Sequence, residues 1–209
     1  MKKIFITFIC AMAVLSVSAQ RASSSSSSFF STESSDQPIT FSIRGGVNFS
    51  NVTVSEGGMS VSPKSHTGFH AGVAVDFPIL ESFYLQSGMY YTVKGYKYGD
   101  EKANPAYLEI PILASYRYNF SDAAQLQINF GPYLAYGVGG KLKAYDYKND
   151  FFGDNFKRFD MGLQVGAGFT FARHYYLGLA YEFGLVNIAK NGNAKFKNTN
   201  FFISAGYQF

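Results

Sequence analysis

Two histidines of this chain stand close to serines in a polar stretch. His66 and His70 follow Ser62 and Ser65. A serine activated by a histidine, itself oriented by a carboxylate, could hydrolyse an ester bond. No further catalytic group converges on this stretch, so we expect no catalytic residues and no enzymatic activity.

Metal binding is not expected either. His66, His70 and His174 lack the spacing of metal ligands, and Cys10 is the single cysteine. The Asp and Asn residues between positions 146 and 155 do not follow the EF-hand pattern. We therefore predict no metal site and no cofactor.

The elements that would position polar side chains are eight stretches in which apolar and polar residues alternate. They cover 39–50, 69–77, 83–94, 107–118, 125–136, 158–171, 175–185 and 201–209. A period of two is typical of strands with two different faces. Their length matches the roughly 9–11 residues of a tilted membrane-spanning strand. Because lipid admits strands only as a closed barrel, these strands should close on themselves.

The connections between these stretches alternate between long and short. Short turns fall near Pro78, Ser121 and Arg173, and longer connections cover roughly 51–65, 97–105, 139–157 and 189–198. This order is typical of outer-membrane barrels with short periplasmic turns, longer external loops and both termini inside. We predict an all-β fold, an eight-stranded antiparallel up-and-down transmembrane β-barrel over residues 38–209. A soluble lipocalin-like barrel is the alternative, although its exposed face would be unusually poor in charge.

Aromatic residues support this orientation, because they mark the periplasmic end of the apolar face on seven strands. These girdle residues are Phe41, Phe77, Phe83, Tyr118, Phe171, Tyr175 and Phe209. On the last strand, Tyr207 and Phe209 share the apolar face. We expect these two residues to serve also as the assembly signal that the barrel-insertion machinery reads.

The N-terminus has the features of a targeting segment. Residues 1–19 combine Lys2 and Lys3, an apolar stretch and small residues before position 20, which predicts a cleaved signal peptide. Residues 20–37 are Ser-rich and predict a flexible periplasmic linker. Without Lys2 and Lys3, 16 basic residues stand against 14 acidic ones. This balance does not favour nucleic acid as a partner.

The polar face of the predicted barrel carries a set of charged residues. They are Arg44, His70, Asp76, Lys94, Glu109, Arg117, Arg158, Asp160 and Glu182. An eight-stranded barrel has room inside only for side chains, so these charges must pair. Hairpin symmetry predicts Lys94 opposite Glu109, Gln86 opposite Arg117, and Gln164 opposite Glu182. A polar network that seals the barrel is the main interpretation, and a narrow polar pore is the alternative.

Pro111 and Pro132 fall inside predicted strands, where each removes a ladder hydrogen bond. We expect a β-bulge at each proline. Leu113 falls on the polar side of its strand, which leaves the register open there.

Six segments together resemble a known family. They are FYLQSGMYYTVKGYK (83–97), AYLEIPILASYRY (106–118), GPYLAYG (131–137), FDMGLQVGAGF (159–169), YEFGLVNI (181–188) and KNTNFFISAGYQF (197–209). The chain resembles the PorT-like family of small outer-membrane β-barrel proteins of Bacteroidetes-type bacteria. The resemblance implies an eight-stranded barrel in the outer membrane and accounts for both prolines. Its name-giving member is tied to export by the type IX secretion system, and the family implies no catalytic residues.

These observations predict a small non-enzymatic outer-membrane barrel, a structural or interaction component that acts through its extracellular loops. Loop residues such as Lys141, Lys143, Phe151, Phe152 and Lys190 could meet lipopolysaccharide phosphates or a partner, although a merely solvated loop is an open alternative. Expected partners are outer-membrane lipid, lipopolysaccharide and the barrel-insertion machinery. An accessory barrel of the type IX secretion system, with secretion-system proteins as partners, is the alternative function. A small pore and a lipid-modifying enzyme are less favoured.

Overall fold

The computed structural model describes residues 37–56, 59–61, 64–98, 101–121, 123–144, 147–152, 156–190 and 195–209. Eight long strands run through this part of the chain: β1 (Thr40–Glu56), β3 (Lys64–Leu80), β4 (Phe83–Val93), β6 (Glu101–Ser121), β7 (Ala124–Ala144), β9 (Phe159–Phe171), β10 (Tyr175–Gly184) and β11 (Lys195–Gln208). Three short strands accompany them: β2 (Met59–Val61), β5 (Tyr96–Tyr98) and β8 (Tyr147–Asp150). The predicted signal peptide, and the predicted linker except Gln37, lie outside the described residues.

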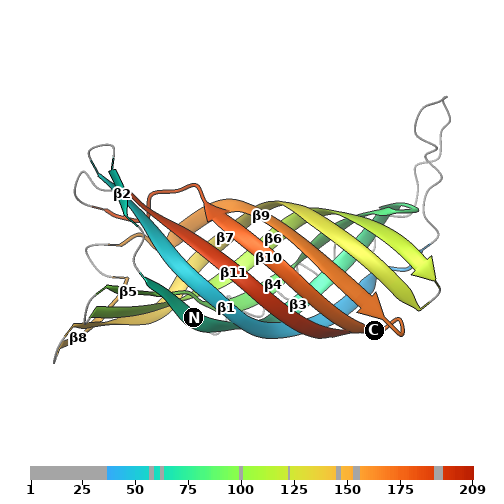
Figure 1. Ribbon diagram of the computed structural model, residues 1–209, viewed down its shortest axis with the longest axis horizontal. Coiled ribbons are helices and arrows are strands. Elements are labelled where there is room, and N and C mark those ends of the chain that lie inside the picture. The colour runs from blue at the N-terminus through green and yellow to red at the C-terminus, as the bar shows by residue number, and fades with distance from the viewer. Residues whose placement is uncertain are drawn as a thin grey trace, which may run out of the picture. The chain divides into compact units, whose positions relative to one another are not determined.

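The eight long strands close into a barrel (Figure 1). Each long strand pairs antiparallel with the next one along the chain, and β1 also pairs with β11, where Ile43 lies opposite Tyr207. Because the first and last strands pair, the wall has no open edge. The predicted eight-stranded antiparallel up-and-down barrel is confirmed. Within the described ranges, no helix has the length and hydropathy needed to cross a membrane.

The barrel carries apolar side chains on its outer face. On β10, Tyr175, Leu177 and Leu179 are each at least half exposed, whereas the alternating residues Tyr176 and Glu182 are buried. A water-soluble protein would bury the first set and expose the second. The wall is therefore built with its apolar face outward and its polar face inward, as a lipid environment requires.

One end of the barrel, which we call the turn end, has short connections. Residues 81–82 join β3 to β4, 122–123 join β6 to β7, and 172–174 join β9 to β10. Ala172 and Arg173 both have positive φ angles, of 49° and 64°, as in the type I′ turns that suit twisted hairpins. The first turn was predicted near Pro78. It lies further on because β3 continues to Leu80, past an irregularity in its pairing with β4.

The opposite end, which we call the loop end, extends beyond the predicted strands. β6 and β7 have 21 residues each, and β5 and β8 pair with their outermost parts. Much of the segments 97–105 and 139–157, predicted as loops, is therefore strand. Alternation could not reveal these extensions, because a strand that projects from the lipid has no apolar face to repeat.

The prediction of bulges at Pro111 and Pro132 was wrong. Pro111 lies opposite Tyr133 and Pro132 opposite Leu163, and the register is continuous around both. A bulge needs an extra residue on one strand, and neither proline introduces one. The irregularities between β6 and β7 lie elsewhere, at Ala106/Tyr107 and Asn119/Ser121.

Candidate functional site

A charged cluster near the turn end is centred on Asp76 of β3. Arg117 Nη2 lies 2.8 Å and Arg44 Nη2 3.7 Å from its carboxylate oxygens. Gln86 Nε2 donates a hydrogen bond of 2.7 Å to the same carboxylate. All four residues are buried. Because two guanidinium groups face one carboxylate, this arginine cluster keeps one positive charge uncompensated.

Tyrosine rings flank the two arginines. The Arg44 guanidinium lies 3.9 Å from the centre of the Tyr176 ring, and that of Arg117 lies 4.0 Å from the centre of the Tyr84 ring. A desolvated cation over an aromatic face is stabilised by up to about 2 kcal/mol. Gly178 provides the space, since a Cβ there would overlap the Tyr176 ring. Inward glycines such as Gly178 indicate from the sequence that room is left for Arg and Tyr side chains, but the sequence does not show which ring lies over which arginine.

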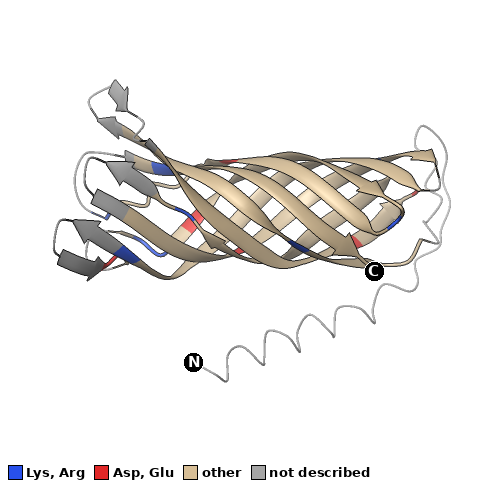
Figure 2. Ribbon diagram, turned by 60° about the horizontal axis from the view of Figure 1, so that its bottom comes forward, with Lys and Arg blue, Asp and Glu red and all other residues tan. Residues whose placement is uncertain are grey.

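A second charged cluster, centred on Lys94, lies toward the loop end. Lys94 Nζ is 2.7 Å from Glu109 Oε2, 2.9 Å from Glu182 Oε2 and 4.0 Å from Asp160 Oδ2. The carboxylates come from β6, β10 and β9, and all four side chains are buried. This lysine cluster therefore has more carboxylates than cations. Charged residues therefore occur along the length of the barrel wall, and not only at its rims (Figure 2).

Hydrogen bonds extend the lysine cluster across the lumen. Asn198 Nδ2 donates to Asp160 Oδ2 over 2.8 Å, and Lys94 Nζ lies 4.6 Å from the centre of the Tyr133 ring. A buried ion pair is stable only when its remaining polar atoms find such partners. The cluster therefore joins strands from opposite sides of the barrel through their side chains.

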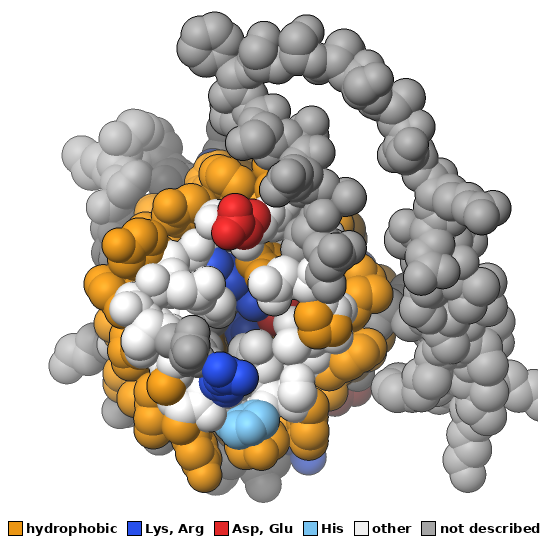
Figure 3. Space-filling view, turned by 90° about the vertical axis from the view of Figure 1, so that its right-hand side faces the viewer, with side chains coloured by type: hydrophobic (Ala, Val, Ile, Leu, Met, Phe, Trp, Pro, Cys, Tyr) orange, Lys and Arg blue, Asp and Glu red, His pale blue; other side chains and the backbone are white. Residues whose placement is uncertain are grey.

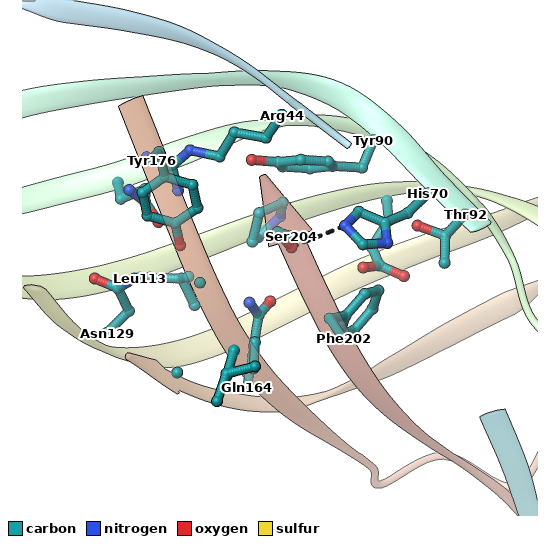
Figure 4. Close-up of a pocket in the computed structure, with 17 residues that line it drawn as sticks. Arg44, His70, Tyr90, Thr92, Leu113, Asn129, Gln164, Tyr176, Phe202 and Ser204 are labelled. Atoms are coloured by element: carbon teal, nitrogen blue, oxygen red, sulfur yellow. Dashed lines mark hydrogen bonds between the residues drawn. The ribbon is translucent and has the colours of Figure 1, made fainter. Parts of the chain in front are cut away.

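A polar cavity of about 50 Å³ separates the two clusters (Figure 4). Arg44 lines it from one cluster and Glu109 from the other. Within it, His70 Nε2 lies 2.9 Å from Ser204 Oγ, the hydrogen bond drawn in Figure 4. His70 Nδ1 and Thr92 Oγ1 have no hydrogen-bond partner among the described residues. The cavity has room for a few water molecules, each of which needs such polar partners.

Aromatic side chains close the lumen at the loop end. Phe151 and Phe152, which follow β8, are buried against Tyr107 and Tyr133. The Phe152 ring lies 5.3 Å from Tyr107, and Phe151 stacks on Phe156 with 4.4 Å between ring centres. We call these five residues the aromatic plug. Phe151 and Phe152 were expected to face a partner, but the plug buries them.

The turn end presents a different surface. Seen end-on, hydrophobic side chains form an outer ring, and basic side chains are visible inside it (Figure 3). At its rim, Asn119, Gln125, Arg173 and Gln208 line a shallow polar pocket of about 130 Å³. The lumen is thus lined by polar groups at this end and covered by aromatic rings at the other.

The structure places the sequence-derived interior residues inside the barrel. Arg44, His70, Asp76, Lys94, Glu109, Arg117, Asp160 and Glu182 are all buried, and Leu113 is buried with them. Arg158 was expected inside but is exposed. It lies one residue before β9 begins and donates a hydrogen bond of 2.9 Å from Nη1 to the Gly137 carbonyl.

The predicted pairings have mixed outcomes. Gln164 lies opposite Glu182, as predicted. Glu109 lies opposite Tyr90 and Gln86 opposite Leu113, so two predicted registers were wrong. The observed register between β4 and β6 is offset from the predicted one by four positions, since Tyr90 and not Lys94 lies opposite Glu109. Lys94 still reaches Glu109, and Gln86 and Arg117 meet at Asp76, because long side chains bridge several positions.

The girdle residues of the sequence analysis lie on the outer face near the turn end. Phe41, Phe83, Tyr118, Phe171, Tyr175 and Phe209 are exposed, and Phe77 is half-buried. Tyr207 is also exposed, and its ring centre lies 5.2 Å from that of Phe209. Tyr207 is therefore on the apolar face of β11, and Phe209 follows directly after the strand on the same side.

Among the described residues, the candidate catalytic and metal-binding groups do not assemble into a site. His70 meets Ser204 rather than Ser62 or Ser65, inside the cavity of the lumen. Ser62 lies outside the described residues. In the part of the chain that the structure covers, no three His, Cys, Asp or Glu side chains come together in a geometry that could hold a metal ion.

Comparison with solved structures finds several outer-membrane proteins of similar size. Solved structures with a similar chain path include Ail of Yersinia pestis (18% identity, covering 81% of this chain and 98% of that chain, TM-score 0.45). OprG from Pseudomonas aeruginosa is another (16%, 81% and 95%, TM-score 0.46). The outer membrane enzyme PagL is a third (14%, 78% and 98%, TM-score 0.45). At these identities the likeness concerns the fold alone. None of the curated proteins matches the chain.

A family model gives the firmer assignment. The model described as "Outer membrane protein beta-barrel domain" matches residues 19–190, most of the chain. It agrees with the closed wall of eight strands and with the outward apolar face. The chain therefore belongs to the outer membrane protein beta-barrel domain family, and it is a small eight-stranded barrel of the outer membrane.

Proposed function

We propose that this chain is a non-enzymatic, sealed outer-membrane barrel that acts as a structural or interaction component through its loop end. The observation that carries the proposal is the filling of the lumen. Two ion clusters occupy it, and the aromatic plug covers its loop end. Among the described residues, the surface that we propose for a partner is the sheet at the loop end, built from the outer parts of β6 and β7 with β5 and β8.

The absence of an enzymatic role is part of the proposal. The Ser–His pair of the interior, His70 and Ser204, lines a cavity of about 50 Å³. A few water molecules fit in such a volume, but an acyl chain or a peptide does not. Hydrolysis needs a substrate carbonyl next to the serine oxygen, and a cavity of about 50 Å³ leaves no room for such a substrate.

The proposal includes the route to the membrane and the partners met there. A signal peptide cleaved after residue 19 exports the chain through the inner membrane, and the barrel-insertion machinery reads Tyr207 and Phe209. Outer-membrane lipid then surrounds the apolar face. The basic residues of the loop end face the lipopolysaccharide of the outer leaflet, in the orientation usual for such barrels.

A shortened loop end tests the function. Lys141 lies opposite Asp150, so an Asn-Gly turn can replace 142–149 and close a two-residue hairpin between them. After cross-linking in native outer membranes, we expect the proteins captured by the parent chain to fall at least tenfold with this variant. The matched control places Asn-Gly at 122–123 of the turn end and should capture the parent set. An unchanged set with the shortened variant would contradict the proposal.

The alternative function is an accessory role in type IX secretion, which the resemblance to PorT-like barrels supports. The same cross-linking experiment distinguishes this export role from a barrel that acts through its loop end. Secretion components recovered in near-equal amounts with the barrel would favour the export role. Their retention by the shortened variant would place the contact away from the projecting sheet.

A further inference from the structure

The polar pocket at the rim of the turn end, which we call the rim pocket, collects side chains from distant parts of the chain. Asn119, Gln125, Thr170, Arg173 and Gln208 line its volume of about 130 Å³. They come from β6, β7, β9, the turn after β9, and β11. Gln125 lies opposite Asn119 on one neighbouring strand and opposite Thr170 on the other. The closure of the barrel therefore builds this pocket.

Hydrogen-bond donors face the rim pocket. Gln125 Nε2 donates a bond of 2.7 Å to Asn119 Oδ1, and this bond leaves the Nδ2 group of Asn119 to donate to another acceptor. Thr170 is only 3% exposed, and its Oγ1 has no hydrogen-bond partner among the described residues. A buried hydroxyl without a partner is costly, so Thr170 indicates that a polar ligand enters the pocket.

Positive charge reaches the rim pocket from two directions. Arg173, which is exposed, contributes a permanent cation to its lining. Arg117 precedes Asn119 by two positions on β6, so it lies one inward layer, about 7 Å, deeper in the barrel. It belongs to the arginine cluster, whose two guanidinium groups face the single carboxylate of Asp76. Charges act over such distances where the dielectric constant is low, so the pocket favours an anion.

The exposed carboxylate that the structure describes at the turn end lies away from the rim pocket. Glu81 is in the turn between β3 and β4. Two long strands separate this hairpin from the β9–β10 hairpin in each direction around the barrel. Figure 3 accordingly shows acidic and basic side chains on opposite sides of the opening. Among the described residues, no carboxylate therefore neutralises the lining of the pocket.

We propose that the rim pocket binds a small free oxyanion, a phosphate or the carboxylate of a small molecule, from the periplasm. The turn end faces the periplasm in the orientation usual for such barrels. The volume corresponds to about four water molecules at about 30 Å³ each, which suits an oxyanion of four or five non-hydrogen atoms. Guanidinium, amide and hydroxyl donors together suit an acceptor with several oxygens. The inference is independent of the proposed function, which concerns the loop end.

Titration of the isotope-labelled full chain with inorganic phosphate, followed by NMR in maltoside micelles at constant ionic strength, tests this inference. We expect saturable shifts of the amide signals of Gln125, Thr170 and Arg173, and unchanged signals at the loop end. The Arg173→Asn variant removes the cation, and asparagine tolerates the positive φ of 64° at this position. Phosphate binding should weaken roughly tenfold or more, because a hydrogen bond to a charged group is lost. Arg158→Asn removes an exposed cation at the loop end and should change the affinity by no more than about twofold.

A second variant tests the pocket without changing its charge. Thr170→Val keeps the shape of the side chain and removes the hydroxyl group. It should fold, because it removes a buried polar atom that has no partner among the described residues. Phosphate binding should weaken about fivefold, as expected for one lost hydrogen bond. Thr67→Val, at an exposed position of β3, is the matched control and should bind as the parent does.

Several outcomes would overturn the inference. Equal weakening by Arg173→Asn and Arg158→Asn, or undiminished binding by Thr170→Val, would place the anion elsewhere. Shifts of the same size with sodium chloride at matched ionic strength would show general screening. A chain that responds neither to phosphate nor to acetate has no oxyanion site.

The source of the oxyanion is tested by repeating the phosphate titration in phospholipid nanodiscs. An affinity equal to that in maltoside supports a free anion, because the surrounding lipid phosphates then do not compete for the pocket. Loss of phosphate binding in nanodiscs alone would assign the pocket to a lipid headgroup and overturn the proposal.

Discussion

Lys94 Nζ lies 2.9 Å from Glu182 Oε2, although the two residues are 88 positions apart in the chain. The ion pair spans the lumen, from the outer end of β4 to β10. Glu109 approaches the same ammonium group from β6. One lysine therefore links three parts of the wall from the inside. We expect its substitution to destabilise the barrel most.

We expect Lys94→Met to lower the free energy of unfolding by about 3–5 kcal/mol, because it leaves Glu109, Glu182 and Asp160 buried without their cation. Urea-induced unfolding of the barrel in lipid vesicles measures this. The exposed Lys141→Met is the control and should change the value by no more than about 0.5 kcal/mol. Equal stability of both variants and the parent would show that the cluster does not support the fold.

Glu109→Ala should likewise destabilise the barrel more than it changes its conductance.

Alternation in the sequence could identify the interior residues but not their partners. It placed Arg44, Asp76 and Lys94 on the inward face because lipid forces every second residue to be apolar. Which charges meet depends on register and on side-chain reach. A hairpin centre misplaced by a few residues put Gln86 opposite Arg117, whereas both in fact bind Asp76.

The loop end was the least predictable part. Its strands lack a repeating apolar face, so β5, β8 and the outermost parts of β6 and β7, 101–106 and 137–144, carried no strand signal. Phe151 and Phe152 read as exposed loop aromatics, since nothing local in the sequence indicates that they fold back over the lumen.

Gly178→Ala should destabilise the barrel by about 1–3 kcal/mol, because a Cβ at this position overlaps the Tyr176 ring that lies over Arg44. Gly139→Ala is the control, since a Cβ there meets no atom within 4 Å. Both are measured by urea unfolding in vesicles. If Gly178→Ala is as stable as Gly139→Ala, Tyr176 has space to move and its stacking on Arg44 contributes little.

Ala172→Gly should raise the free energy of unfolding by about 0.5–1 kcal/mol. Ala172 has a φ of 49°, a conformation that glycine adopts without the Cβ penalty. Ala123 lies in the turn between β6 and β7 and is not among the residues with positive φ. Ala123→Gly should therefore leave stability unchanged or lower it slightly. A gain from both substitutions would point to general turn flexibility and against strain at Ala172.

The aromatic plug can be followed by fluorescence, because the chain contains no tryptophan. Phe152→Trp should place a single indole in an apolar site, with blue-shifted emission and poor quenching by acrylamide. A Cβ at Gly137 would overlap the Phe152 ring, so adding Gly137→Ala should expose the indole and shift its emission to the red. Adding Gly139→Ala should have no such effect. Strong quenching in Phe152→Trp alone would mean that the plug is open.

The most direct test of a sealed barrel is single-channel conductance in planar bilayers. We expect the parent chain to give no discrete conductance steps above the lipid background. Phe151→Ala/Phe152→Ala should also give none, because the Lys94 and Asp76 clusters still fill the lumen beneath the plug. Regular ion-selective steps from the parent, altered in size by Glu109→Ala or Lys94→Met, would contradict the account and establish a pore through the interior.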